Sequence, residues 1–187
     1  MRPHTVIVRT LLLVGLFTAL SHQAVWADGD DAYAGTAEEK ASLIKTINTK
    51  RMAIEARKGD LTRHELSTAS LREQIKQKWS KLDFYADGES LVRVKTYPHK
   101  GISARTEEFY FEDGELIFAI IQDKGEAAAE SGEGAAKQYF YSDGKFVGEV
   151  NETEEEEQSI RHSDEERLEA EAMEYIRIFK AHFTGKK

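Results

Sequence analysis

The chain has 187 residues, no cysteine, and 34 acidic against 26 basic side chains, so its formal net charge at pH 7 is −8. This charge argues against binding to nucleic acid, whose phosphate backbone would repel the protein, and against electrostatic docking on anionic lipid. The absence of cysteine excludes thiol catalysis, disulfide exchange and cysteine metal sites. It also favours a bacterial envelope protein over a small disulfide-dependent secreted domain.

The first 27 residues have the three-part pattern of a secretory signal. Arg2 and Arg9 make the start basic, an apolar stretch covers residues 10–20, and Val25 and Ala27 suit the small-residue positions before a cleavage site. The apolar stretch is shorter than the roughly 20 residues that a membrane-spanning helix needs. We therefore expect cleavage after Ala27. Residues 28–187 should then form one domain in the periplasm or outside the cell, without a membrane span.

Residues 36–80 carry helical patterns. Thr36 and Glu39 fit a capping box, in which the side chain of each residue bonds the backbone of the other. Apolar residues then recur at three- and four-residue steps, which favours an amphipathic helix. Gly59 interrupts this pattern, and a second start signal at Thr62 follows it. The sequence thus predicts two helices here, arranged as a hairpin or a bent pair.

Between residues 82 and 151, three similar units place an Asp-Gly pair between two runs of strand-forming residues. The pairs are Asp87-Gly88, Asp113-Gly114 and Asp143-Gly144. Glycine accepts the positive φ of a tight hairpin turn, and aspartate accepts it better than most residues. The units therefore predict three hairpins, or about six strands. A calcium-loop interpretation fails because none of the units supplies oxygen ligands at alternate positions.

Residues 163–183 form the clearest helical pattern of the chain. Ser163 and Glu166 fit a second capping box, and acidic residues in a first turn favour a helix N-terminus. An apolar stripe follows at Leu168, Ala172, Ile176, Phe179 and Phe183. The expected fold class is α+β: an antiparallel β-meander of about six strands, flanked by N-terminal helices and a C-terminal amphipathic helix.

Motifs for catalysis or cofactor binding are absent from the sequence. It contains no Gly-x-Ser-x-Gly elbow, no phosphate-binding glycine loop and no His-x-x-x-His pair. The sequence therefore predicts no cofactor and no catalytic residues.

Aromatic residues gather at the ends of the predicted hairpin strands. Because successive strand residues face opposite sides of a sheet, either helices cover both faces or one face displays an aromatic patch. The candidate binding residues on such a patch are Tyr85, Tyr110, Tyr139 and Tyr141. The leading hypothesis is a non-enzymatic binding module that uses its sheet face or an edge strand to bind an envelope protein or a glycan.

Two alternatives stay open at this point. One is a small hydrolase or lyase that acts on envelope glycans through carboxylates and His99. The other is a weak divalent-metal site that combines His162 with the acidic run at Glu152 and residues 154–157, although such a run is also typical of a solvated linker.

Overall fold

A computed structural model describes residues 33–67, 75, 78–99, 105–123, 136–151 and 162–185. The predicted signal, residues 1–27, and the acidic run at 152–157 lie outside the described residues. A long helix stands near each end of the described part, α1 (Ala37–Ala56) and α4 (His162–Phe183), and the short 3₁₀ helix η1 (Lys58–Asp60) follows α1. The strands are β1 (Thr62–Ser67), β2 (Trp79–Asp87), β3 (Ser90–Pro98), β4 (Arg105–Glu112), β5 (Glu115–Asp123), β6 (Ala136–Ser142) and β7 (Lys145–Asn151).

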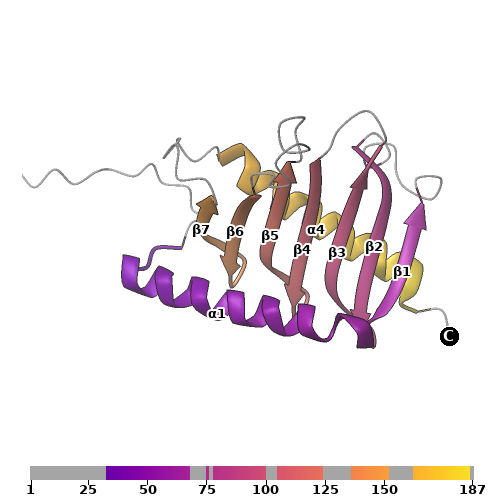
Figure 1. Ribbon diagram of the computed structural model, residues 1–187, viewed down its shortest axis with the longest axis horizontal. Coiled ribbons are helices and arrows are strands. Elements are labelled where there is room, and N and C mark those ends of the chain that lie inside the picture. Colours follow the sequence, from indigo (N-terminus) through magenta and orange to yellow (C-terminus); the bar gives the residue numbers. More distant parts are fainter. Residues whose placement is uncertain are drawn as a thin grey trace, which may run out of the picture.

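The strands form one antiparallel sheet in which spatial order follows chain order from β1 to β7. The predicted α+β meander is thus confirmed, with seven strands instead of about six. Helix α1 runs across one face of the sheet along the ends of the hairpins, and α4 crosses the opposite face (Figure 1). Within the described residues, no helix is long and apolar enough to cross a membrane.

Each face of the sheet has its own apolar core. Leu168, Ala172 and Phe179 of α4 pack with Phe84 and Phe109 on one face. On the other face, Ile47 and Ile54 of α1 pack with residues that alternate with these along the strands: Tyr110, Phe118, Phe140 and Val147. The alternation of strand side chains therefore serves two cores, because helices cover both faces.

The turns of the three hairpins do not all have the same form. Asp113 and Gly114 both have positive φ, as do Asp143 and Gly144, which is the pattern of the type I′ turn. In the first hairpin Asp87 pairs with Ser90, so Gly88 and Glu89 are the central residues. Of these two only Gly88 has positive φ, as in a type II′ turn. In this unit the Asp-Gly pair therefore stands one residue earlier, relative to the centre of the turn, than in the other two.

The predicted second helix from Thr62 is wrong over its first residues, which form strand β1. Leu66 is buried, whereas the neighbouring Glu65 and Ser67 are exposed. This alternation has the period of a strand. All six residues of β1 pair with residues Lys81–Ala86 of β2, and this pairing outweighs the local start signal. Trp79, expected at the end of that helix, begins β2 instead.

The start of α1 is as the sequence predicts. The Thr36 amide donates to Glu39 Oε2 at 2.7 Å, and the Glu39 amide donates to Thr36 Oγ1 at 3.2 Å. A substitution at either position would remove one bond and weaken the other, at a cost of about 1 kcal/mol. The capping box fixes where α1 begins and therefore which of its residues face the sheet.

Candidate functional site

The four candidate tyrosines do not form one exposed patch. Tyr85 and Tyr110 lie on the α1 face, whereas Tyr139 and Tyr141 lie on the α4 face. All four are buried, with exposed fractions between 1% and 7%. The expectation of a shared aromatic surface is therefore corrected: adjacent strand residues point to opposite faces, and a helix covers each face.

The two candidate histidines are also separated. His99 follows β3, is partly exposed, and does not line the groove described below. His162 begins α4, but its side chain lies outside the described residues. Among the side chains that the structure describes, no group of three or more His, Asp or Glu could hold a metal ion.

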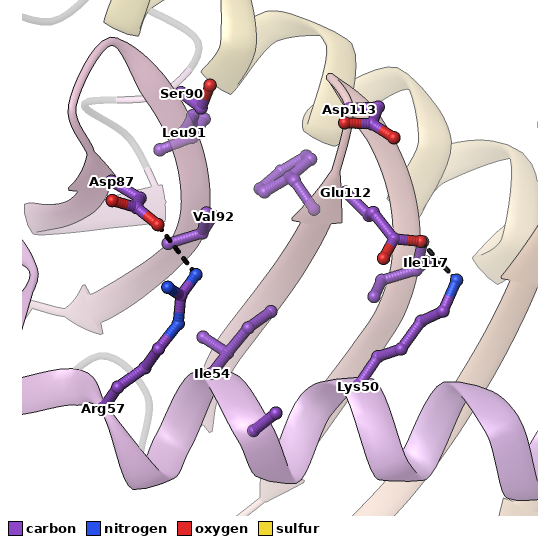
Figure 2. Close-up of a pocket in the computed structure, with 12 residues that line it drawn as sticks. Lys50, Ile54, Arg57, Asp87, Ser90, Leu91, Val92, Glu112, Asp113 and Ile117 are labelled. Atoms are coloured by element: carbon purple, nitrogen blue, oxygen red, sulfur yellow. Dashed lines mark hydrogen bonds and ion pairs between the residues drawn. The ribbon is translucent and has the colours of Figure 1, made fainter.

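The structure instead contains a groove between α1 and the turn ends of two hairpins (Figure 2), with a volume of about 380 Å³. Its apolar lining comes from α1 and strands β3 to β5: Ala53, Ile54, Leu91, Val92, Phe111 and Ile117. Its polar rim comes from the same helix and from the turns: Lys50, Arg57, Asp87, Ser90, Glu112 and Asp113. Its volume stands near the lower end of the roughly 300–1,000 Å³ of ligand sites, and polar residues make up half of its lining.

Two ion pairs link α1 to the hairpin turns across the groove (Figure 2). Arg57 Nη2 lies 2.9 Å from Asp87 Oδ2, and Lys50 pairs with Glu112. All four side chains are about half exposed, and exposed pairs of this kind contribute at most about 1 kcal/mol each. A ligand could therefore displace either pair at low cost.

Helix α1 presents a small residue, Ala53, to the groove. Ala53 lies at the wall next to Ile54, which is 8% exposed. On the sheet, the successive residues Leu91 and Val92 face opposite cores, Leu91 toward α4 and Val92 toward α1. Val92 therefore lies beside Ile54 at the base of the groove, and both are less than a tenth exposed.

A buried polar network holds the C-terminal half of α1 beside this groove. Arg93 Nε lies 3.1 Å from Glu55 Oε1 and 3.2 Å from Glu108 Oε2, and the Tyr110 hydroxyl donates to Glu55 at 2.8 Å. Lys95 Nζ lies 2.7 Å from Glu108 Oε1. The network ties α1 to β3 and β4 and so sets the width of the groove.

Charge in this network determines the protonation of its members. Burial alone would raise the pKa of Glu108, but the charge of Arg93 and hydrogen bonds from Lys95 and Arg93 lower it below its usual 4.5. Burial, together with the charge of Glu108, raises the pKa of Tyr110, so its hydroxyl stays protonated and can donate. The network is therefore an ionised carboxylate held by the cations Arg93 and Lys95 and by the Tyr110 hydroxyl.

A second buried carboxyl group lies on the opposite face, under α4. Glu107 is 1% exposed, and its Oε1 accepts from Arg167 at 3.0 Å and from Arg105. Burial and the charge of Glu171 raise the pKa of Glu107, and a hydrogen bond between the two carboxyl groups adds to this effect. Burial opposes ionisation of Glu171 too, but bonds and charge from Lys78 and Arg167 lower its pKa.

This pair of carboxyl groups does not have the geometry of a glycosidase. Such enzymes hold their two carboxyl groups about 5 Å or more apart on either side of a substrate. Glu107 and Glu171 both accept from Arg167 Nη1, at 3.0 and 3.2 Å, and Glu107 is closed off from solvent. The pair joins α4 to the sheet and lines no described cavity.

Comparisons with known proteins found no matching family model, no similar curated protein and no similar solved structure.

No residue was predicted from the sequence to line this groove, although the sequence contains one signal for it. After each hairpin turn two apolar residues stand side by side: Leu91-Val92, Leu116-Ile117 and Phe146-Val147. In each pair the first residue enters the α4 core and the second the α1 core. Adjacent apolar residues in a strand indicate that both faces are covered, and this pattern points to α1 as a cover.

Proposed function

We propose that this chain is an exported, non-enzymatic interaction module of the cell envelope, which binds a protein partner in the groove between α1 and the hairpin turns. The groove is the observation that supports this proposal. It has a volume of about 380 Å³ at the surface and an apolar base, and the ion pairs of its rim side chains are weak. Partner side chains that dominate binding insert into pockets of this kind.

The apolar floor favours a protein partner over a glycan. Ile54, Val92 and Ile117 line the groove with hydrocarbon, which suits an apolar side chain of a partner. The rim supplies both charges, with Lys50 and Arg57 on one side and Asp87, Glu112 and Asp113 on the other. A partner would thus insert an apolar residue and exchange the present ion pairs for its own.

Blocking the groove tests this proposal. Ala53 is an exposed residue on the groove wall, so Ala53→Trp should fill the cavity without disturbing a core. Ala56→Trp is the matched control, because Ala56 is equally exposed on the same helix but does not line the groove. Nile red serves as an apolar probe. Its fluorescence should rise with the wild type and the control, and about tenfold less with Ala53→Trp.

The same variants test partner binding. Cross-linked pull-down from the native envelope extract identifies a candidate, and titration of the purified candidate against all three proteins then measures its affinity. We expect Ala53→Trp to weaken binding at least tenfold and Ala56→Trp to leave it unchanged. Equal affinity of the three proteins for every candidate would refute the groove as the binding site.

A further inference from the structure

The two edges of the sheet differ in how they are covered. At the β7 edge, the amide of Tyr33 donates to the carbonyl of Phe146 at 2.8 Å, so the segment before α1 lies against this strand. At the other edge, β1 pairs with β2 on one side, and no described residue pairs with its outer side. An uncovered edge strand presents unpaired backbone groups that another strand can bond.

The side chains of β1 carry opposite charges two positions apart. Arg63 and Glu65 therefore lie on the same face, where Arg63 Nη2 lies 3.1 Å from Glu65 Oε2 of the same strand, and their side chains are 48% and 54% exposed. Arg63 also lies 2.9 Å from the buried Asp83. His64 stands between them on the opposite face, where its ring stacks on Phe183 at a centroid distance of 4.5 Å. The edge thus has a short charge pattern centred on His64.

This pattern is complementary to itself in one arrangement. When two copies of β1 lie antiparallel with His64 opposite His64, Arg63 of each copy faces Glu65 of the other. Opposite charges directly across an antiparallel pair are favourable, and like charges are not. Such an arrangement is two-fold symmetric and closed, as in most homodimers.

We propose that the protein forms a homodimer in which the β1 strands of two copies pair antiparallel about His64 and join the two sheets into one. Backbone hydrogen bonds between the two edges supply the affinity, and the two Arg63–Glu65 pairs set the register. The dimer interface lies at the opposite end of the sheet from β7 (Figure 1). It does not depend on the groove.

Sedimentation velocity of the purified protein across about 10 to 300 µM should show a monomer–dimer equilibrium. Glu65→Arg places two arginines opposite each other in this register, and we expect it to weaken the dimer about tenfold or more. Arg63→Glu should do the same. An equimolar mixture of the two variants should dimerise again, because every cross-strand pair is then of opposite charge. A wild type that stays monomeric throughout, or a mixture that fails to associate, would overturn the proposal.

A second measurement covers the case in which Arg63→Glu fails to fold because Asp83 loses its partner. The chain has no cysteine, so a single introduced cysteine reports on proximity without background. Oxidation of His64→Cys should give a disulfide-linked dimer, since position 64 faces itself across the two-fold axis. Ser67→Cys is the control: it is exposed on the same strand but lies away from its counterpart. Equal cross-linking of both variants would contradict the proposed register.

Discussion

Glu107 and Glu108 are neighbours in β4, both are buried, and their pKa values shift in opposite directions. Glu108 faces α1 and meets the cations Arg93 and Lys95, so its pKa is lowered. Glu107 faces α4, where Glu171 competes for the positive charge of Arg167, so its pKa is raised. Burial is common to both residues. The balance of charge on each face therefore decides whether the pKa of a buried acid is raised or lowered.

The raised pKa of Glu107 agrees with a detail of its contacts. Glu107 Oε1 accepts from Arg105 and Arg167, whereas Oε2 is buried and receives no hydrogen bond from any described residue. A carboxyl oxygen that carries a proton needs no donor. Ion pairs join a helix to the sheet on both faces: Arg167 of α4 bonds Glu107, and Arg93 bonds Glu55 of α1.

Removal of the Arg93 guanidinium should lower the stability of the protein more than any other change at these two sites. Arg93→Met keeps the volume of the side chain but leaves Glu108 and Glu55 without their shared guanidinium. Loss of one partner of a buried ion pair is strongly destabilising, and we expect the free energy of unfolding to fall by about 3 kcal/mol. Urea denaturation at pH 7 measures this. A fall of less than 1 kcal/mol would show that Lys95 alone can hold Glu108.

Neutral substitutions of the two glutamates should have unequal effects. Glu108→Gln removes a charge that Arg93 and Lys95 need, and we expect a loss of about 2 kcal/mol. Glu107→Gln resembles the protonated acid, since its amide can donate to Glu171, and we expect a loss below about 1 kcal/mol. Urea denaturation of both variants measures the two losses in the free energy of unfolding. Losses of equal size would mean that Glu107 is ionised in the folded protein.

The pH dependence of stability follows from the same contrast. Folded Glu107 keeps a proton that the unfolded chain releases above pH 4.5, so its contribution is complete below pH 4.5 and is lost as pH rises through the raised pKa. Glu108 behaves oppositely: its contribution is present above pH 4.5 and is lost as pH falls through the lowered pKa.

Glu107→Gln separates these two effects because glutamine does not titrate. The stability of the wild type minus that of Glu107→Gln should decrease with rising pH above 4.5, by at most about 1.4 kcal/mol per pH unit for one proton. Urea denaturation between pH 4 and pH 8 gives this difference. A difference that stays flat, or rises with pH, would contradict the raised pKa.

The parts of the fold that local pattern specifies were predictable from the sequence. The capping box at Thr36, the apolar stripe from Leu168 to Phe183, and the turns at Asp113 and Asp143 each depend on residues close in the chain. Strand β1 was not predictable in this way. Its identity comes from pairing with β2, and the local start signal at Thr62 pointed to a helix.

The candidate sites were harder to predict than the fold. The groove combines Ala53 of α1 with Val92 of β3 and Ile117 of β5, and no short motif relates these positions. Glu107 and Glu171 likewise come from a strand and a distant helix. With 34 acidic residues in the chain, the sequence does not indicate which two will share Arg167 as a partner. Only the arrangement of the strands and helices brings them together.

Glu112, a third glutamate of β4, provides the smallest effect and a control for the other two. It pairs with Lys50 at the rim of the groove, and both side chains are a little over two-fifths exposed. Solvent screens such a pair, so Glu112→Gln should change the free energy of unfolding by less than about 0.5 kcal/mol. The same urea titration measures it. A loss as large as that of Glu108→Gln would show that the rim pair holds α1 on the sheet, and the groove would then not open at low cost.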